Sequence, residues 1–493
     1  MSPDEEIFDV VIVGAGLSGI GAACHLAARC PAKTYAILET RQAIGGTWDL
    51  FRYPGIRSDS DMHTLGYAFA PWRARESIAD GPSIRAYVRQ AARDHDIERH
   101  IRFGHRLRRA RWSSEAACWT LEVDVAQADP AAPPRAATLR ARMLSMCSGY
   151  YRYDRGHAPQ FEGMADFRGP IVHPQFWPEE LEHAGRRVAV IGSGATAVTL
   201  VPALAQTAAL VTMIQRSPTW VASLPAVDRI AVWLRRLLPD ALAYRLVRAK
   251  NVLVQRWIYR QTREHPERVR AHLLAEVRKQ LGPDYDVEKH FTPRYDPWDQ
   301  RLCLVPDADL FVAIREGRAS VATDRIARFV PSGIELESGQ RIEADIVVSA
   351  TGLELEVLGG AEFEVDGRKV DFAETLTYKG MMYSDVPNLV QTFGYINASW
   401  TLRADLTAEW VCRVLETMDR RGARRATPRL RPEDRAMPTR PWIDGFTPGY
   451  MQRAMHLFPK QGDREPWLNT QDYARDRKML RRGPIEDGVL VLD

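Results

Sequence analysis

Cysteine is scarce in this sequence, and its spacing excludes the usual roles of paired cysteines. The chain has six cysteines in 493 residues, at positions 24, 30, 118, 147, 303 and 412. None of them forms a Cys-x-x-Cys pair or a spacing typical of a zinc site. This pattern is typical of a protein from a reducing compartment, and we predict no metal site.

The sequence also lacks a membrane-spanning segment and a strong charge of either sign. The long apolar run Ile7 to Ala28 contains Asp9, His25 and three glycines of a turn, and therefore predicts a strand, a loop and a helix. Met1 to Glu6 is acidic where a signal peptide would be basic. A net charge of +4 is too mild to indicate a nucleic-acid surface. We therefore expect a cytoplasmic protein that binds no nucleic acid.

The length of the chain predicts several domains. A chain of 493 residues is too long for one core and long enough for two or three domains of ~150 residues each. Its hydrophobic content of 45% and charged content of 26% are ordinary for a globular protein.

A dinucleotide-binding turn lies near the start of the chain. A predicted strand, Phe8–Val13, leads into Gly14-Ala15-Gly16-Leu17-Ser18-Gly19 and then a small-residue helix, Ile20–Ala28. A second strand, Thr34–Leu38, ends at Glu39, twenty residues after Gly19. The acid can accept hydrogen bonds from an adenosine ribose while the helix N-terminus faces the pyrophosphate. We expect Gly14, Gly16, Ser18, Gly19 and Glu39 to bind a dinucleotide; glycines that serve packing alone are the alternative.

The same theme returns in the middle of the chain. Strand Arg187–Ile191 leads into Gly192-Ser193-Gly194-Ala195-Thr196-Ala197, helix Val198–Ala205 and strand Val211–Gln215. Where Glu39 stood, this unit has Arg216 followed by Ser217. A guanidinium there pairs with a 2′-phosphate, whereas an acid selects the free ribose of NAD. We predict NADPH at Gly192, Ser193, Gly194, Ala195, Thr196, Ala197, Arg216 and Ser217; a surface arginine is the alternative.

Two loops after Glu39 indicate that the first turn binds FAD. Their sequences are Gly-Gly-Thr-Trp-Asp (45–49) and Leu-Phe-Arg-Tyr-Pro-Gly-Ile-Arg-Ser-Asp (50–59). Both resemble the flavin-side loops of FAD monooxygenases. A flavin disulfide reductase would carry a cysteine pair shortly after Gly-Gly-Thr, whereas the next cysteine here is Cys118. We expect FAD contacts from Gly46, Thr47, Trp48, Asp49, Leu50, Arg57, Ser58 and Asp59.

The next part of the chain predicts further strands of the FAD sheet. Strand Ile101–Leu107 is expected to bring backbone to the adenine, with Leu107 as a contact. The segments Trp112–Val125 and Ala137–Cys147 flank a proline-rich turn, Pro130–Pro134, and predict a hairpin.

A linker between the two turns carries a more specific pattern. The spacing Phe-x-Gly-x-x-x-His-x-x-x-Trp-Pro places Phe167, Gly169, His173, Trp177 and Pro178 in one segment just before the second turn. The alternative is an irregular loop with an aromatic anchor and only a structural role. In this context, however, the pattern resembles the fingerprint of the type I Baeyer-Villiger monooxygenases. Such a linker would hold two Rossmann domains at a fixed separation and provide a hinge.

By resemblance to that family, Arg301 is the arginine that works beside the flavin, and a purely structural arginine is the alternative. Many members have a lysine before it, whereas this chain has Gln300, which is normal in the ethionamide-activating branch that the chain resembles most. A carboxylate beside a flavin needs a partner because an unpaired buried charge is costly. We expect Asp59 to pair with Arg301; Asp61 and a solvated Asp59 are the alternatives.

The resemblance implies an α/β fold of two Rossmann-like dinucleotide-binding domains, for FAD and NADPH, with a helical insertion. It implies insertion of one oxygen atom of O2 into ketones, giving esters or lactones, and oxygenation of sulfides or thioamides, through a C4a-peroxyflavin. The expected divisions are an FAD part (1–150), an NADPH part (151–220), the insertion (221–295), a second NADPH part (296–352), and a second FAD part with the substrate pocket (353–493).

The predicted insertion is helical and basic. Apolar residues recur at helical spacing, among them Ile230, Trp233, Leu237, Leu253 and Trp257. Thirteen Lys or Arg stand against four acids between Arg229 and Lys279. Peripheral contact with an anionic membrane is one hypothesis, and a solvated helix face is the other.

In the last part of the chain, Asn397-Ala398-Ser399 is expected to cap a helix over Leu402–Asp419. Trp400 is expected either to reach the nicotinamide nucleotide or to belong to the core. The irregular segments Phe446–Tyr450 and Leu457–Gln461 are candidates for the pocket lining.

Three other functions compete with the predicted one. They are a heteroatom-oxidising flavin-containing monooxygenase limited to S- and N-oxygenation, an NADPH:flavin reductase or oxidase that wastes the peroxide, and a non-enzymatic dinucleotide redox sensor.

Overall fold

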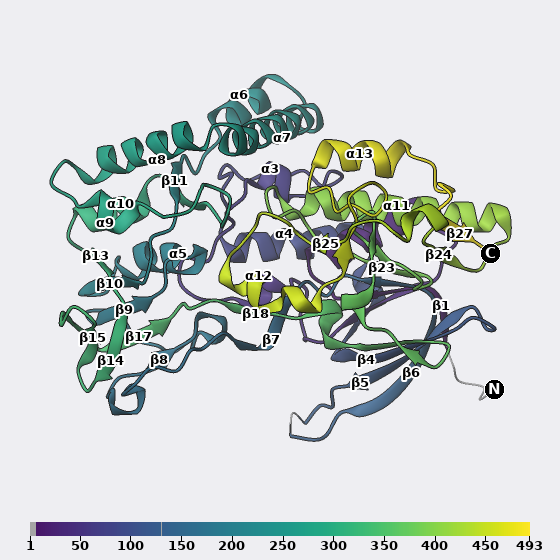
Figure 1. The fold of residues 1–493 in the computed structure, drawn as a ribbon, viewed down its shortest axis with the longest axis horizontal. Coiled ribbons are helices and arrows are strands. Elements are labelled where there is room, and N and C mark those ends of the chain that lie inside the picture. Colours follow the sequence, from purple (N-terminus) through teal and green to yellow (C-terminus); the bar gives the residue numbers. More distant parts are fainter. Residues whose placement is uncertain (1–5, 130) are drawn as a thin grey trace.

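The computed structural model describes residues 6–129 and 131–493. The acidic start, Met1 to Glu5, and Pro130 of the proline-rich turn lie outside these residues. Two sheets with helices on their faces form the body of the molecule (Figure 1). The predicted α/β class is confirmed.

The larger sheet combines strands from residues 7–146 with strands from residues 362–391. Its order is β20-β19-β4-β5-β6-β1-β2-β3, with β23 also paired to β6. Strands β1, β2, β3, β6 and β23 pair in parallel, while β4, β5 and β6 form an antiparallel meander. The strands are β1 (Ile7–Val13), β2 (Tyr35–Glu39), β3 (Ile101–Phe103), β4 (His105–Ser113), β5 (Cys118–Val125), β6 (Arg135–Met146), β19 (Glu362–Val365), β20 (Arg368–Lys369) and β23 (Leu389–Gln391).

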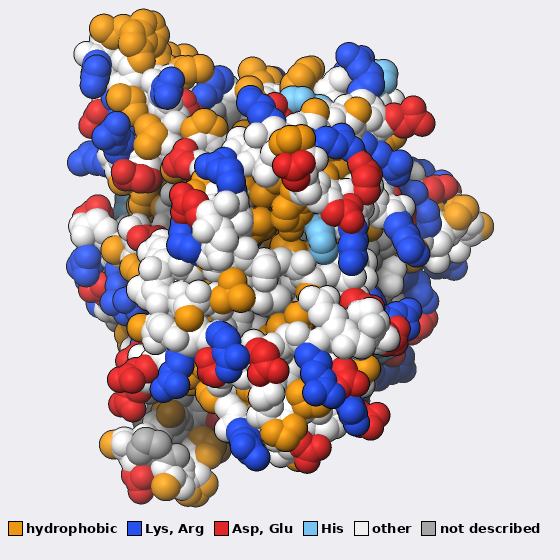
Figure 2. Space-filling model, turned by 90° about the vertical axis from the view of Figure 1, so that its left-hand side faces the viewer, with side chains coloured by type: hydrophobic (Ala, Val, Ile, Leu, Met, Phe, Trp, Pro, Cys, Tyr) orange, Lys and Arg blue, Asp and Glu red, His pale blue; other side chains and the backbone are white. Residues whose placement is uncertain are grey.

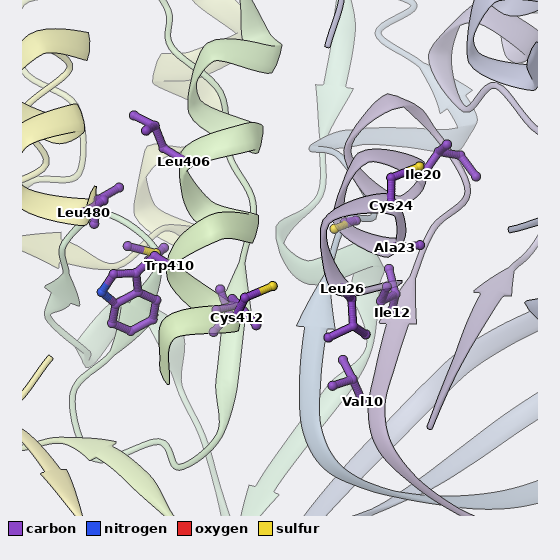
Figure 3. Packing of buried hydrophobic residues seen from close by; sticks show 14 of the residues in the cluster. Val10, Ile12, Ile20, Ala23, Cys24, Leu26, Leu406, Trp410, Cys412 and Leu480 are labelled. Carbon is purple, nitrogen blue, oxygen red and sulfur yellow. The ribbon is translucent and has the colours of Figure 1, made fainter. Parts of the chain in front are cut away.

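Both faces of the central strands are buried, because β1 is apolar on both sides. Val10 and Ile12 pack under α1 (Leu17–Arg29), α4 (Gly81–Asp94) and α11 (Trp400–Arg421). Figure 3 shows the labelled α1 side chains next to Val10 and Ile12 of β1, the labelled α11 side chains across from them, and Leu480 of α13 (Tyr473–Arg482) beyond α11. Val11 and Val13 pack on the opposite face against side chains of the meander. The β1–α1 turn is therefore held from both sides.

The smaller sheet is entirely parallel, in the order β13-β10-β9-β17-β8. Val188 and Val190 of β9 face α5 and α10, and Ala189 and Ile191 face a three-stranded antiparallel sheet, β14-β15-β16. The elements are β8 (Ile171–Val172), β9 (Arg187–Ile191), α5 (Ala195–Leu204), β10 (Leu210–Gln215), α10 (Asp309–Arg315), β13 (Ala319–Thr323), β14 (Ile326–Val330), β15 (Gly333–Leu336), β16 (Arg341–Glu343) and β17 (Ile346–Ser349).

Helices α6, α7 and α8 lie along the upper edge of Figure 1. They span Arg229–Leu237, Asp240–Glu264 and Pro266–Leu281, and α9 (Val287–Phe291) follows. This stretch leaves and re-enters the smaller domain through the parallel pair β11 (Val221–Leu224) and β12 (Cys303–Pro306). Among the described residues, no helix combines the length and apolarity needed to cross a membrane.

Shorter elements complete the fold. They are α2 (Thr47–Leu50), α3 (Met62–Leu65), β7 (Tyr151–Gly156), β18 (Leu353–Leu355), β21 (Thr377–Tyr378), β22 (Met382–Tyr383), β24 (Ala426–Pro428), β25 (Arg440–Pro441), α12 (Gly449–Ala454), β26 (Lys460–Gln461) and β27 (Leu490–Leu492).

The bounds of these elements test three local predictions. The predicted strand Ile101–Leu107 is two strands, because Gly104 takes φ +69° and turns the chain between β3 and β4, which leaves Leu107 in the core of β4. The predicted hairpin is confirmed, because β5 and β6 pair in antiparallel fashion, although the segment Trp112–Val125 is divided between β4 and β5. Ser399 is the N-cap residue of α11 but makes no side-chain cap, since its hydroxyl pairs with Thr64 Oγ1 at 2.6 Å.

Candidate active site

The first glycine-rich turn, between β1 and α1, leaves no room for side chains at two of its glycines. Gly14 has φ +104°, and a Cβ atom there would lie 2.6 Å from the Cys147 carbonyl oxygen. A Cβ atom on Gly19 would lie 1.8 Å from the Gly14 carbonyl oxygen. No side chain of the described residues caps α1 at Gly16. The first N–H groups of this helix are therefore suited to an anionic pyrophosphate.

Glu39 stands beside this turn at the end of β2. Its carboxylate accepts hydrogen bonds from the backbone N–H of Ala15 at 2.7 Å and of Arg41 at 2.8 Å. Burial raises the pKa of Glu39, and the two backbone hydrogen bonds oppose that rise. The acid predicted to bind a ribose is thus fixed at the mouth of the turn.

The Gly45–Leu50 loop packs directly on the first turn. The backbone N–H of Gly45 donates to the Ala15 carbonyl at 3.1 Å, and a Cβ atom on Gly16 would lie 3.4 Å from Gly46 Cα. This close approach fits an extended cofactor that passes from one loop to the other.

Asp49 in α2 has its own partners. Its buried carboxylate accepts from Arg41 at 2.7 Å and from Arg85 at 3.3 Å. Burial alone would raise the pKa of Asp49, but the hydrogen bond and charge of Arg41, with Arg52 and Arg85, lower it overall. The Asp49 carboxylate is therefore already paired with arginines. The predicted contact of Asp49 with FAD stays a prediction, and we expect the Asp49 backbone rather than its side chain to make it.

The second flavin-side loop, residues 50–59, is fastened to the smaller domain. Arg57 makes a bidentate ion pair with Asp309 of α10, at 2.5 and 3.3 Å. Gly55 lies against α5, since a Cβ atom there would be 2.6 Å from Ala203 Cβ. Ser58 is buried and accepts from the Ser60 N–H at 2.9 Å. The predicted FAD contacts of Arg57 and Ser58 remain predictions, and both side chains already hold this loop.

The second glycine-rich turn, between β9 and α5, repeats the first one. Gly192 has φ +135°, and a Cβ atom there would lie 2.3 Å from the Ala350 carbonyl oxygen. A Cβ atom on Gly194 would meet nothing within 4 Å among the described residues. No side chain of that part of the chain caps α5. The turn is thus open on the side where a phosphate would approach the helix N-terminus.

Arg216 follows β10 at the carboxyl edge of the smaller sheet. Its side chain is exposed, and within residues 6–129 and 131–493 it forms no ion pair. The neighbouring Ser217 carbonyl accepts from Ser193 Oγ at 3.0 Å, which holds this segment beside the turn. Thr196 instead faces the other domain, where it lies beside Tyr53. The predicted 2′-phosphate partner is therefore a cation next to the turn that has no ion-pair partner among the described residues.

Arg301 and Asp59 meet although 242 residues separate them. Arg301 Nη1 lies 2.5 Å from Asp59 Oδ2, and about a third of each side chain is exposed. The Asp59 carboxylate holds the pKa of Arg301 well above its ordinary value. Asp61 is not the partner, because it caps α3 and accepts from Asn251 and Gln255 of α7, each at 2.8 Å. The expected pair is thus present, and its catalytic role stays a prediction.

Aromatic side chains lie beside this pair. We call Tyr150, Tyr151, Trp400 and Tyr450 the aromatic wall. Tyr450 in α12 lies beside the Arg301 guanidinium, and burial raises the pKa of its hydroxyl while the charge of Arg301 opposes that rise. Tyr150 and Tyr151 share a hydrogen bond of 2.8 Å between their hydroxyls, and both contribute to the electrostatic environment of Arg301. Trp400 stacks on Tyr150 with ring centroids 5.3 Å apart and donates to Ser18 Oγ at 2.7 Å. Trp400 therefore bridges the first turn and the aromatic wall.

The linker that carries the fingerprint lies against the two segments that cross between the domains. Strands β7 and β18, the two crossings between the sheets, pair in antiparallel fashion. His173 Nε2 lies 3.2 Å from the Gly352 carbonyl, at the second crossing. Burial lowers the pKa of His173, which favours the neutral ring in this contact.

The other fingerprint residues anchor the same linker to the smaller domain. Phe167 is buried against Phe329, and a Cβ atom on Gly169 would lie 2.2 Å from the Asp345 carbonyl oxygen. Trp177, followed by Pro178, packs on the α5 core. The fingerprint residues thus anchor the linker to the smaller domain and to the second crossing, and a hinge at this linker stays a prediction.

A family comparison decides the class of the protein. The profile described as "Flavin-binding monooxygenase-like" matches residues 80–420, more than two thirds of the chain. The chain belongs to the flavin-binding monooxygenase-like family. A second profile, "NAD(P)-binding Rossmann-like domain", matches residues 12–74 of this family member, which include the first glycine-rich turn. The resemblance to flavin monooxygenases that the sequence predicted is confirmed.

Named relatives of this monooxygenase-like chain span nearly its whole length. It is 52% identical over 483 residues to "FAD-containing monooxygenase EthA" of Mycobacterium tuberculosis, with 98% of this chain and 97% of the relative covered. It is 46% identical to "Probable FAD-binding monooxygenase AlmA" of Acinetobacter baylyi, with 99% and 97% covered.

Solved structures share the fold of the family member. An "Oxidized steroid monooxygenase bound to NADP" superposes with a TM-score of 0.71 at 24% identity, covering 87% of this chain and 88% of that one. A cyclohexanone monooxygenase in an open crystal form gives a TM-score of 0.75 at 18% identity, covering 99% and 100%.

Three tyrosines beside Arg301 are not singled out by the sequence of this monooxygenase-like chain. Tyr450 was placed only within a segment expected to line the pocket, and no spacing singles out its contact with Arg301. Tyr150 and Tyr151 were not selected either, although they directly follow Gly149, where the chain leaves the FAD sheet. That position at a strand end is the signal that could have found them.

Proposed function

We propose that this protein is an FAD- and NADPH-dependent monooxygenase of the Baeyer-Villiger type. It transfers one oxygen atom of O2 to a ketone, giving an ester or lactone, and also oxygenates sulfides or thioamides. The Arg301–Asp59 pair carries this proposal, because it fixes a cation where the flavin-side loop meets the segment before β12. A cation held in that way serves oxygen transfer rather than dithiol chemistry.

FAD fits the first turn and its neighbouring loops. The uncapped α1 N-terminus would hold the pyrophosphate, Glu39 the ribose, and the backbone of Gly46 to Leu50 the ribityl chain. Bound and reduced, the flavin supplies the activation of O2, which the side chains of a protein cannot supply.

NADPH fits the second turn. The uncapped N-terminus of α5 would bind its pyrophosphate, and the exposed Arg216 would pair with the 2′-phosphate. Ser193 and Ser217 hold the loop beside that cation. NADPH supplies the hydride that reduces the flavin.

The chain's own part in the chemistry is to fix charge. The Arg301 guanidinium donates to the negative charge that develops on the substrate carbonyl oxygen, and a preoriented donor costs no reorganisation at that moment. Asp59 orients the guanidinium through their ion pair and keeps it protonated. The Tyr450 hydroxyl lies beside the same guanidinium and adds to its electrostatic environment. With cofactors and substrate bound, the aromatic side chains beside the pair would shield the reacting atoms from water.

We propose the domain division given by the sequence: FAD at 1–150 and 353–493, NADPH at 151–220 and 296–352, and the insertion at 221–295. The protein works in the cytoplasm, and the basic charge of its insertion permits peripheral contact with a membrane.

One experiment separates the proposal from its alternatives. The purified yellow protein is reduced with NADPH without oxygen, then mixed with O2 and either a cyclic ketone or an aryl sulfide. Flavin bleaching, followed by lactone and sulfoxide products, is expected. Sulfoxide without lactone favours the heteroatom-oxidising type, stoichiometric peroxide favours an oxidase, and the absence of bleaching favours a redox sensor.

A further inference from the structure

Exposed apolar side chains are concentrated on one part of the described chain, the helical insertion. Of the thirteen large hydrophobic residues that are exposed among the described residues, nine lie between Leu224 and Trp257. Side chains so exposed are normal when scattered singly, whereas a gathered patch indicates an interaction site.

The exposed residues form a stripe along each of two contacting helices. In α6, Ile230, Trp233 and Leu237 recur at three and four residues, and the side chain of Trp233 is 59% exposed. In α7, the stripe is Leu242, Leu246, Leu253 and Trp257, with Leu253 and Trp257 each 63% exposed. Spacings of three, four and seven residues place side chains on one face of a helix. We call these seven residues the α6–α7 apolar face.

The opposite side of α7 is the one that packs on the protein. Tyr244 donates to the Tyr67 carbonyl at 2.9 Å, and Asn251 and Gln255 donate to Asp61. The α6–α7 apolar face therefore cannot be explained as the buried side of a core helix.

Unpaired cations border the apolar face. Arg229, Arg236 and Arg245 are exposed and form no ion pair within the described part of the chain. Figure 2 shows hydrophobic and basic side chains side by side at the upper edge of the molecule, the height at which Figure 1 draws α6 and α7. Tryptophan and leucine on one face with arginine beside them is the pattern of a helix that lies in a membrane interface.

We propose that the α6–α7 apolar face inserts into the interface of a bilayer that contains anionic lipid. This goes beyond charge-driven contact, because the apolar side chains enter the acyl boundary while the arginines bind headgroups. A second copy of the chain fits this face less well, since it would bring Arg229, Arg236 and Arg245 against the same cations of the copy. The proposal does not depend on the monooxygenase reaction.

The first test is co-sedimentation of the whole protein with vesicles of phosphatidylglycerol and phosphatidylcholine. We expect binding that weakens as salt rises but persists above the range where charge is screened. The double variant Trp233→Ser/Trp257→Ser is expected to lose ~10-fold or more in vesicle affinity, because two aromatic side chains leave the apolar phase. The matched control Ile7→Ser/Val491→Ser removes two exposed apolar residues elsewhere and is expected to bind like the unchanged chain.

A label on the face gives a second readout that does not depend on variant stability. All six cysteines are free and buried, so an environment-sensitive thiol dye selects the new thiol of Leu253→Cys or of the control Val491→Cys. A blue shift with vesicles at position 253 alone is expected. Equal shifts at both positions, equal binding of both double variants, or a dimer that the tryptophan variant dissolves would overturn the proposal.

Discussion

The two glycine-rich turns have the same backbone but opposite charge at the next strand end. In both, the first glycine has a positive φ and faces a carbonyl oxygen of a crossing segment, Cys147 in one and Ala350 in the other. Glu39 beside the first turn is buried and hydrogen-bonded to two backbone N–H groups, whereas Arg216 beside the second is exposed and unpaired among the described residues.

This difference indicates how the same type of glycine-rich turn can bind a different cofactor in each domain. A fixed, buried acid suits a cofactor that stays bound, because the acid is already oriented. An exposed arginine suits a cofactor that enters and leaves with each turnover, since its charge can capture the 2′-phosphate in solvent. The backbone supplies the phosphate site, and a single side chain sets the specificity.

An alanine in place of one glycine in each turn should affect the two turns differently, and the change in the first turn should have the largest effect of all the variants proposed. Gly19→Ala places a Cβ atom 1.8 Å from a backbone oxygen, so we expect loss of bound flavin and a free energy of unfolding lower by about 3 kcal/mol. Gly194→Ala meets nothing within 4 Å and should keep both. Flavin absorbance per protein and chemical denaturation measure the outcome. Equal flavin content in the two variants would contradict the account.

Arg301→Ala tests the catalytic role of the guanidinium that lies between the two turns. We expect ketone oxygenation to fall by ~10² to 10³, because a fixed donor to the developing negative charge is lost, while FAD binding and NADPH-dependent bleaching persist. Arg294→Ala, an exposed arginine in the same segment, is the control. Product yield and stopped-flow absorbance separate the two steps. Full turnover of Arg301→Ala would refute the catalytic role.

Arg216→Ala should sharpen the contrast with Glu39. Loss of a charge-assisted contact is expected to raise the KM for NADPH by ~10- to 100-fold and to leave that for NADH unchanged. Arg186→Ala, exposed at the opposite edge of the same sheet, should change neither constant. If Arg216→Ala raised the KM for NADPH and the KM for NADH alike, Arg216 would not bind the 2′-phosphate selectively.

Tyr450→Phe is expected to have the smallest effect. It removes the hydroxyl that lies beside Arg301, so kcat for the ketone should fall by ~3- to 10-fold with the KM for NADPH unchanged. As a positioning effect, it should also shift the pH profile of kcat, whereas Tyr285→Phe in the insertion should not. An unchanged profile would remove Tyr450 from the site.

Sequence reasoning succeeded where the requirement is local. The strand–turn–helix units were predicted within a few residues, because only glycine fits at Gly14 and Gly192 and the flanking strands are apolar on both faces. The strand Ile101–Leu107 failed for an equally local reason, since nothing in its apolar pattern reveals that Gly104 adopts a positive φ.

The contacts between distant segments could not be derived from spacing. Asp59 and Arg301 were joined only through the resemblance to a family, and Tyr450 was not joined to them at all. The insertion shows a further limit: its helical periodicity was correct, but periodicity does not say which apolar face is buried. Tyr244 and Val247 are buried, while Leu253 and Trp257 of the same helix are exposed.

The central claim is that this chain transfers an oxygen atom from O2 with the help of Arg301. The most direct measurement is mass analysis of the ester or lactone formed from a ketone under isotopically labelled O2. The account predicts one labelled oxygen atom in the product of the unchanged protein and almost no product from Arg301→Ala. Unlabelled product, or equal labelled product from both proteins, would contradict it.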